Sequence, residues 1–274
     1  MSVTQSEKAA HFRALHEAKA AFVIANAWDG GSARILAGTG FQALATSSSA
    51  QANTLGRRDG AVTRDEALAH CRAIVVATDL PVSADLEHGF GDSPESCAET
   101  IRLAAEAGLV GGSIEDSTGA SARPIYDIGH ATERIVAAVE AARGCSFPFS
   151  LTARSENFIS GITDLHDTIR RLQAFERAGA DVLFAPGLPD LESVRTVCAA
   201  LTKPVNFMVG IRGRSFTVAA LESAGVKRIS LATSLYRAAM SGLADAAREV
   251  HEHGTFGYLD RGLTSAELNA FMKS

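Results

Sequence analysis

The sequence predicts an α/β protein in which eight parallel strands close into a (β/α)8, or TIM, barrel. Eight short apolar runs alternate with helix-like stretches between residues 22 and 250, a rhythm typical of parallel strands joined by crossover helices. The chain length of 274 residues is close to the usual length of one such barrel, about 250 residues. The alternative, an open doubly wound sheet, usually carries a G-x-G-x-x-G motif after its first strand. Residues 28–32 read Trp-Asp-Gly-Gly-Ser instead.

The first half of the barrel is predicted from four apolar runs and the helices that follow them. Strands are expected at residues 22–27, 41–46, 81–85 and 110–115, and helices at residues 32–37, 63–78, 94–107 and 131–143. Thr63 and Glu66 have the spacing of a capping box at the start of their helix. Gly108 and Gly144 stand where helices commonly end. Residues 47–60 are polar and are predicted to form a loop.

The second half of the chain repeats this pattern and adds a tail. Strands are expected at residues 147–153, 181–185, 204–209 and 227–232, and helices at residues 165–178, 190–200, 216–224 and 235–250. A helix at residues 6–19 precedes the barrel. The tail, residues 254–274, contains a loop (254–262) and a short helix (265–272) with enough apolar residues to pack on its own barrel or on a partner subunit. We expect one domain over residues 1–274, with the barrel at residues 20–250.

The composition is ordinary for a globular protein with a large core. Hydrophobic residues make up 46% of the chain and the net charge is −5, and the absence of a basic patch argues against nucleic-acid binding. No apolar stretch approaches the roughly 20 residues that span a bilayer, and residues 1–20 do not resemble a signal peptide. The four cysteines are widely separated, as expected of reduced thiols. We therefore expect a cytoplasmic protein without membrane or nucleic-acid partners.

Two predicted strands end in pairs of acidic residues. The third strand leads into Asp85 and Glu87, and the fourth into Glu115 and Asp116. Residues i and i+2 of a strand point to the same face, and the carboxyl ends of barrel strands form the active-site mouth. An oxygen-rich cluster of this kind suits a hard divalent cation such as Mg²⁺. A single acidic pair is also consistent with a solvated strand end.

Other strand ends contribute polar groups that could bind a carboxylate substrate. Ser47, Ser48 and Ser49 follow the second strand and offer hydroxyl and N–H donors, although the same residues suit a simple polar turn. Arg154 ends the fifth strand, where its planar fork fits a substrate carboxylate or a structural ion pair with a neighbouring strand. Asn206 lies in the seventh strand, either as a substrate ligand or as a satisfied core amide.

Taken together, these stretches resemble the isocitrate lyase/phosphoenolpyruvate mutase superfamily over nearly the whole barrel. The matching stretches are residues 26–29 with 32–33, 47–49, 56–59, 85–91 (Asp-Leu-Glu-His-Gly-Phe-Gly), 114–116, 153–156 (Ala-Arg-Ser-Glu) and 235–239. The combination is far more specific than any one of these motifs. It implies a TIM barrel enzyme, commonly a tetramer (a dimer of dimers) whose subunits exchange their last barrel helix.

The resemblance also implies a chemistry and assigns roles to residues. It implies Mg²⁺, with Mn²⁺ as an alternative, held mostly through water by Asp85, Glu87 and Glu115. The substrate is expected to be a small 2-oxo or 2-hydroxy acid whose carboxylate or phosphonate meets Ser47, Ser48, Ser49 and Arg154. Asp59 matches an acidic residue on a mobile gating loop. Arg154, Asp59 and Glu115 are the expected catalytic residues, and the reaction passes through an enolate.

Two departures from the superfamily's motifs narrow the expected reaction. Residues 117–124 lack the Cys, Lys and His of the lyase signature and the lysine of the mutases, and residues 185–187 read Ala-Pro-Gly in place of His-x-Ser. We therefore expect a Mg²⁺-dependent lyase or hydrolase that cleaves a C–C bond, with an oxaloacetate-type substrate favoured. The alternatives are phosphonopyruvate-type C–P chemistry and a non-catalytic barrel that binds metal and acid. Tyr126, Arg123 and Glu156 are the candidates for the general acid or base.

A Schiff-base aldolase is a further possible function, and the positions of the lysines argue against it. The only lysines near predicted strands are Lys203 and Lys227. Both precede their strands and so lie at the end of the barrel opposite to the expected mouth.

Overall fold

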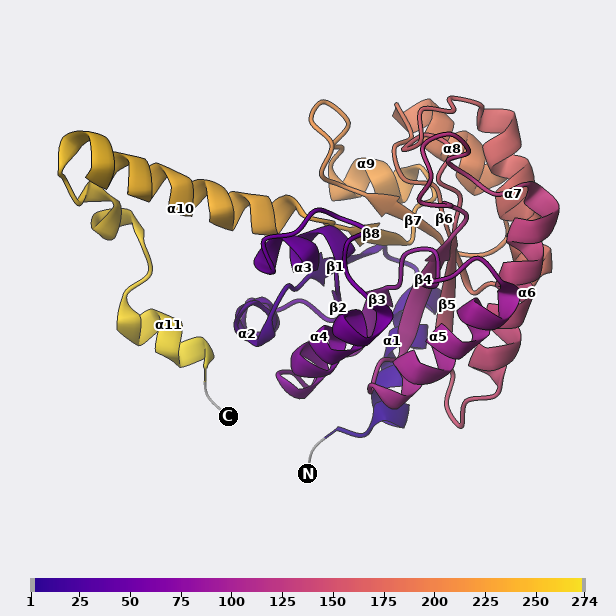
Figure 1. Cartoon of the computed structure of the whole chain (residues 1–274), viewed down its shortest axis with the longest axis horizontal. Helices are drawn as coiled ribbons and strands as arrows, with labels where there is room; N and C mark the ends of the chain where they lie inside the picture. The colour runs from indigo at the N-terminus through magenta and orange to yellow at the C-terminus, as the bar shows by residue number, and fades with distance from the viewer. Residues whose placement is uncertain (1–2, 273–274) are drawn as a thin grey trace.

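The computed structural model describes residues 3–272 and contains a closed barrel of eight parallel strands in sequence order (Figure 1). The strands are β1 (Phe22–Asn26), β2 (Leu44–Ala45), β3 (Val82–Asp85), β4 (Gly111–Glu115), β5 (Ser150–Arg154), β6 (Val182–Phe184), β7 (Val205–Met208) and β8 (Arg228–Ser230). Each strand pairs with the next, and β8 pairs with β1 through Phe22 and Arg228. The predicted (β/α)8 barrel is confirmed.

Helices surround this barrel at nearly the predicted positions. They are α1 (Gln5–Glu17), α2 (Gly30–Gly38), α3 (Ser48–Thr54), α4 (Arg64–Val76), α5 (Pro94–Glu106), α6 (Ile128–Arg143), α7 (Leu165–Arg177), α8 (Leu191–Ala199), α9 (Val218–Ser223), α10 (Ser234–His253) and α11 (Ser265–Phe271), with a 3-10 turn at Gly257–Arg261. The capping box of Thr63 and Glu66 forms as predicted. The prediction of a loop over residues 47–60 is wrong in its first half, because Ser47 caps α3 by accepting a bond from the Ala50 N–H.

Helix α1 closes the amino-terminal end of the barrel. Phe12 is fully buried there, and the rings of Phe12, His16 and Phe22 meet edge to face. Gly111 at the start of β4 allows this close approach, since a Cβ atom at that position would lie 3.0 Å from the Phe12 ring and 2.9 Å from the Ser150 carbonyl oxygen. These rings form the floor of the barrel.

The barrel interior above this floor is unusually polar. TIM barrels commonly fill the interior with bulky branched side chains. Here many positions that face the interior carry polar groups, beside apolar ones such as Ile24 and Phe184. The polar residues are Asn26, Ser83, Ser113, Thr152, Asn206, Arg228 and Ser230. These side chains leave a cavity that opens toward the carboxyl ends of the strands.

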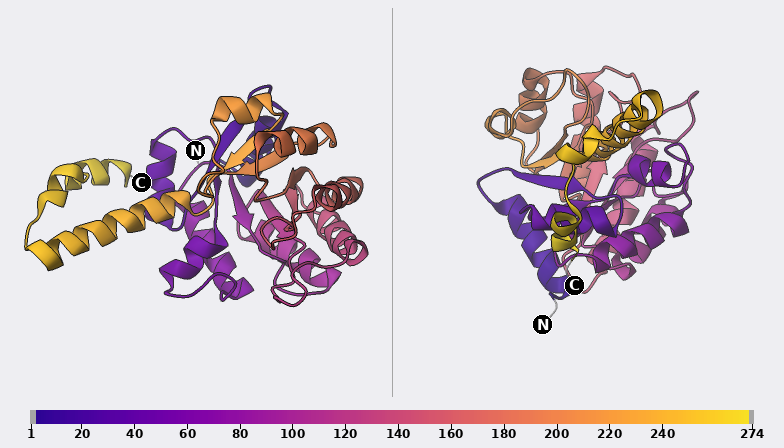
Figure 2. Two further views of the ribbon diagram at one scale, coloured as in Figure 1. Left: turned by 90° about the horizontal axis from the view of Figure 1, so that it is seen from above. Right: turned by 90° about the vertical axis from the view of Figure 1, so that its left-hand side faces the viewer.

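Helix α10 differs from the other barrel helices because it projects away from the barrel (Figures 1 and 2). Among its residues only Tyr236 is buried, and apolar side chains such as Leu243, which is 62% exposed, face solvent. The chain then returns, and α11 packs on α2 of the same barrel with Phe271 against Gly38. Of the two partners expected for the tail, its own barrel is contacted in this structure. No helix within residues 3–272 is long and apolar enough to cross a membrane.

Candidate active site

Arg154 is the centre of an ionic cluster at the carboxyl ends of β3, β4 and β5. Its guanidinium contacts three carboxylates, with Nη1 2.9 Å from Asp85, Nη2 3.1 Å from Glu115 and Nε 3.0 Å from Glu156. The Arg154 side chain is only 13% exposed. The structure thus brings together three of the predicted site residues, and it places Arg154 in the ion-pairing role that the sequence left open beside substrate binding.

The first residue of α3, Ser48, is joined to this cluster through Asp85. The Ser48 hydroxyl donates to the Asp85 carboxylate at 3.1 Å, and the Ser48 N–H lies 3.4 Å from the same oxygen. Ser47 caps α3 and lines the cavity. Ser49 lies in the first turn of α3 and does not line the cavity. The three predicted serines therefore face different surroundings.

Glu87 occupies a strained position beside Asp85. Its backbone φ is 50°, in the left-handed region that non-glycine residues rarely adopt, and its N–H lies 3.4 Å from the Asp85 carboxylate. Burial, followed by the negative charges of Asp85 and Asp59, raises the pKa of Glu87 to about 7. Burial also raises the pKa of Asp59, with a hydrogen bond from the Ser48 side chain and the charge of Asp85 acting in opposite directions. Asp59 therefore lies close enough to Ser48, Asp85 and Glu87 to interact with the cluster.

Asp116 does not join the cluster, although the sequence paired it with Glu115. Adjacent strand residues point to opposite faces, and Asp116 is turned outward. Its carboxylate accepts bonds from the Glu156 N–H at 2.8 Å and from Arg171 at 3.0 Å, and Arg171 is held in turn by Asp167 at 2.7 Å. Asp116 has a structural role, because it fixes the backbone that carries Glu156.

The cavity beneath the cluster has a volume of about 90 Å³ and is lined by side chains from the barrel strands. Asn206 lies in its wall, with its amide oxygen accepting from Arg228 Nε at 2.8 Å and its amide nitrogen donating to Ser230 at 3.1 Å. The oxygen and the nitrogen of this amide are both hydrogen-bonded within the protein, as expected of a satisfied core amide. Arg228 was not recognised from the sequence. It lies two residues before Ser230 in β8, and residues two apart in a strand point to the same face, so this spacing is the signal that its side chain points inward.

The loop after β4 folds away from the cavity. Ser117 pairs with Ile125 across it, and Arg123 forms an exposed ion pair with Asp127 at 3.0 Å. The Tyr126 hydroxyl donates to Asp92 at 2.5 Å. Neither Arg123 nor Tyr126 lines the cavity. Of the three candidate acid–base residues, only Glu156 contacts the cluster.

Arg134, on α6, is a second residue that the sequence did not reveal. Its side chain is buried and donates to the carbonyl oxygens of His88, Gly91 and Glu115, while its guanidinium lies 4.3 Å from the centre of the Tyr126 ring. Arg134 therefore joins the loop that carries Glu87 to the end of β4 at Glu115. Its partners are main-chain atoms, which leave no signal in the sequence.

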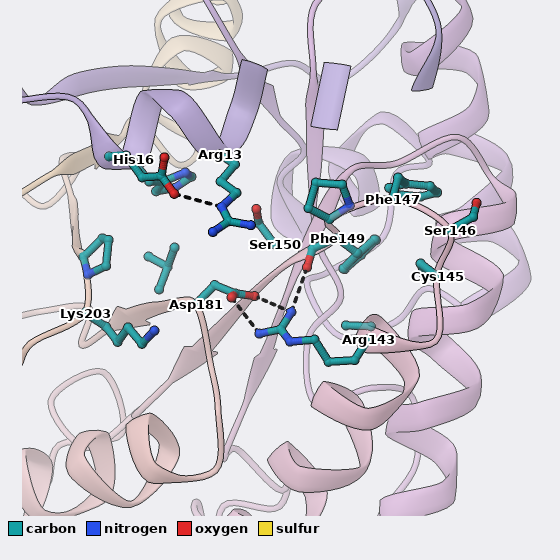
Figure 3. Close-up of a pocket in the computed structure, with 15 residues that line it drawn as sticks. Arg13, His16, Arg143, Cys145, Ser146, Phe147, Phe149, Ser150, Asp181 and Lys203 are labelled. Atoms are coloured by element: carbon teal, nitrogen blue, oxygen red, sulfur yellow. Dashed lines mark hydrogen bonds and ion pairs between the residues drawn. The ribbon is translucent and has the colours of Figure 1, made fainter. Parts of the chain in front are cut away.

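A larger pocket lies at the opposite end of the barrel (Figure 3). Its volume is about 600 Å³, and it is bordered by α1 and by the amino ends of β5 and β6. Figure 3 shows Arg143 reaching Asp181, an ion pair of 2.7 Å, and Arg13 is paired with Glu17 at 2.8 Å. The acidic cluster lies at the other end of the strands, so this pocket is not the candidate active site.

Comparison with known proteins identifies the family. A model of the family described as phosphoenolpyruvate phosphomutase matches residues 12–251. The chain belongs to this family. A crystal structure from Burkholderia cenocepacia J2315, described as a candidate lyase or mutase, shares 48% identity and a TM-score of 0.96 and covers 98% of this chain and 97% of that one.

Two characterised relatives have named activities. Oxaloacetate decarboxylase of Ectopseudomonas mendocina (strain ymp) is 28% identical over 266 residues, covering 94% of this chain and 86% of that one. The 2-methylisocitrate lyase of Escherichia coli (strain K12) is 32% identical over 209 residues, covering 73% of this chain and 69% of that one. The superfamily resemblance inferred from the motifs is confirmed.

The crowded carboxylates of this phosphomutase-family barrel predict a pH-dependent effect of metal on stability. The pKa of Glu87 is higher in the folded protein than its ordinary value of 4.5. The folded state therefore holds that proton more tightly, and stability is lost as the pH rises from about 4.5 through about 7. We expect the Tm of the protein in EDTA to fall across this range and Mg²⁺ to raise Tm much more at pH 8 than at pH 5.5.

The measurement is a thermal melt at each pH in EDTA and in Mg²⁺, with Glu87→Gln as the control. This variant should flatten the dependence because position 87 no longer titrates. An equal effect of Mg²⁺ on Tm at pH 5.5 and pH 8 in the unmodified protein would contradict the expected role of Glu87 in binding the metal.

Proposed function

We propose that this enzyme is a Mg²⁺-dependent lyase or hydrolase that cleaves a C–C bond in a small 2-oxo or 2-hydroxy acid, with an oxaloacetate-type substrate favoured. Membership in a family of lyases, mutases and hydrolases makes it an enzyme, and the carbon–carbon lyase class fits its relatives. The observation that carries the proposal is the cluster of Asp85, Glu87 and Glu115 around Arg154, above a small polar cavity.

The donor set at the mouth fits a hard cation bound partly through water. Within residues 3–272, no three acidic, histidine or cysteine side chains converge closely enough to hold a metal directly. Mg²⁺ commonly keeps several water ligands and takes only one or two carboxylates from the protein. Burial, followed by the negative charges of Asp85 and Asp59, raises the pKa of Glu87, and a dication bound beside these carboxylates would stabilise their charged forms. Asp85, Glu87 and Glu115 are the proposed metal residues.

The metal and the side chains around the cavity have separate proposed roles in the reaction. When bound, Mg²⁺ would act as a Lewis acid that polarises the substrate carbonyl. Arg154 holds Asp85 and Glu115 in place and keeps a positive charge at the edge of the cavity, where an enolate would develop negative charge. Ser47 lines the same cavity as a donor to the substrate carboxylate. Asp59, which lies near Ser48 and Asp85, is the proposed acidic residue of the gating loop.

The test is pyruvate release from a panel of acids. The panel contains oxaloacetate, phosphonopyruvate, methylisocitrate and citramalate, each with Mg²⁺ and with EDTA. We expect Mg²⁺-dependent release from one C–C substrate, with oxaloacetate first. Release of pyruvate from phosphonopyruvate alone would favour C–P chemistry. If no acid of the panel released pyruvate although the protein bound Mg²⁺, a non-catalytic barrel would be favoured.

We also propose that the chain is a homo-oligomer, as expected of the family, with α10 exchanged between subunits. Support comes from the length of α10 and its exposed apolar side chains, including Met240 and Leu243. Leu243→Lys is expected to reduce the molecular mass in solution to that of a smaller assembly, because a charge would be buried at the contact. Light scattering after gel filtration measures this. Asp245→Lys on the same helix is the control, and a monomeric unmodified protein would contradict the proposal.

A further inference from the structure

The inner end of the cavity holds a cation that no acidic side chain neutralises. Arg228 is only 5% exposed. Its Nε donates to the Asn206 amide oxygen at 2.8 Å and its Nη2 to the Thr152 hydroxyl at 3.0 Å, both neutral acceptors, and Nη1 has no partner within residues 3–272. Burial of a charged group is costly unless an opposite charge accompanies it. The geometry therefore leaves one donor and one positive charge unsatisfied.

The groups around Arg228 cannot supply this missing charge. His16 lies below it, and burial together with the charge of Arg228 lowers the pKa of His16 to about 3, so the ring is neutral. The cavity wall contains neutral side chains, among them Asn26, Ser83, Ser113 and Ser230, and the Asp85 carboxylate that also lines it is paired with Arg154. Burial, followed by the repulsion of Arg154, also lowers the pKa of Arg228 to about 9, which still leaves the guanidinium charged at neutral pH.

Arg154, the other cation lining the cavity, differs in its surroundings. Its three nitrogens are each occupied by a different carboxylate, from Asp85, Glu115 and Glu156. An incoming anion would have to compete with three negative charges for Arg154. At Arg228 it would compete with none within ion-pairing distance among the described residues.

We propose that Arg228 forms an anion subsite at the inner end of the cavity and that this subsite takes one carboxylate of a compact dicarboxylic acid. The substrate class rests on the proposed function, because the acid's other end would face the carboxylate cluster and its metal. A guanidinium suits this role, since its planar fork matches a carboxylate. The cavity of about 90 Å³ restricts the ligand to a small acid.

The chain offers a variant that neutralises Arg228 without removing it. Asn206→Asp has nearly the same shape and places a carboxylate oxygen where the amide oxygen already accepts the Arg228 bond at 2.8 Å. The Ser230 hydroxyl, 3.1 Å away, can turn its proton toward the new oxygen. We expect this variant to weaken anion binding, because the new carboxylate pairs with Arg228. Asn53→Asp, the same change on the exposed face of α3, is the control.

Formate is the probe, titrated by calorimetry into the protein in EDTA, where no metal can hold it. We expect the unmodified protein and Asn53→Asp to bind formate, and Asn206→Asp and Arg228→Gln to bind at least about tenfold more weakly. Equal binding by the unmodified protein and Asn206→Asp, or no binding by the unmodified protein, would overturn the subsite. Because Asn206→Asp retains Arg228, a folding failure of Arg228→Gln does not affect the test.

A second titration, in Mn²⁺, tests the substrate class. Malonate should bind more tightly than acetate to the unmodified protein, and this preference should disappear in Asn206→Asp. A preference that survives in the variant would overturn the dicarboxylate assignment. Failure of the proposed function would be recognised separately, because the protein would bind no metal or release no pyruvate from any acid. Neither result affects the formate titration in EDTA.

Discussion

Asp85→Asn is expected to reduce metal-dependent turnover about a thousandfold or more while leaving the barrel folded. Asparagine keeps the shape of Asp85 and can still accept the Ser48 bond, but it removes a charge from the proposed metal site. Loss of Lewis-acid stabilisation costs several kcal/mol, and about 4 kcal/mol corresponds to a thousandfold in rate. Pyruvate release, Mn²⁺ affinity and Tm are measured together, and Asp85→Ala should behave in the same way.

The matched control is Asp181→Asn. Asp181 also pairs with an arginine, Arg143 at 2.7 Å, but at the opposite end of the barrel. It should leave Mn²⁺ affinity and turnover close to normal. If Asp85→Asn retained normal metal-dependent turnover, the assignment of the metal site would be wrong.

Arg154→Met is expected to cause the largest loss of stability. It removes the shared partner of Asp85, Glu115 and Glu156 and leaves three carboxylates close together. Breaking a buried ion pair in this way costs about 3–5 kcal/mol, which corresponds to a fall in Tm of roughly 10 °C. Burial already raises the pKa values of Glu115 and Glu156. The loss should therefore be larger at pH 8 than at pH 5, where protonation removes the repulsion.

Arg154→Lys separates the charge of this residue from its geometry. One ammonium cannot reach three carboxylates at about 3 Å as the guanidinium does, so we expect partial recovery of Tm but little recovery of activity. A near-normal KM with reduced kcat would indicate that Arg154 organises the carboxylates without touching the substrate. Normal stability of Arg154→Met at pH 8 would show that the cluster does not depend on the arginine.

Much of the fold could be predicted because short stretches of the sequence indicate its strands and helices. Apolar runs and capping residues such as Thr63 mark where strands and helices begin, and the eightfold alternation indicates closure. The helix α3 was missed because polar residues 47–54 carry no apolar stripe, and a serine cap looks the same as a turn. The projection of α10 depends on what packs against it, which a pattern within one helix does not contain.

The site was predictable to the extent that strand ends identify it. Asp85, Glu115 and Arg154 meet because parallel strands end at one edge of the barrel. Asp116 was grouped with Glu115 although neighbouring strand positions face apart. Arg228 and Arg134 were missed for different reasons. Arg228 is the first residue of β8, and the sequence analysis looked for site residues at the carboxyl ends of strands. Arg134 binds carbonyl oxygens that any sequence possesses.

The strained backbone at Glu87 has a consequence for how this protein can change over evolutionary time. Glu87 and Phe90 both have positive φ angles, 50° and 57°, which cost of order 1–3 kcal/mol each. The loop therefore does not keep its shape by itself, and Arg134, from a distant part of the chain, holds it through main-chain bonds. Loss of Arg134 would remove these main-chain bonds whatever side chains the loop carries, so Arg134 is expected to be retained in any descendant that keeps the strained loop.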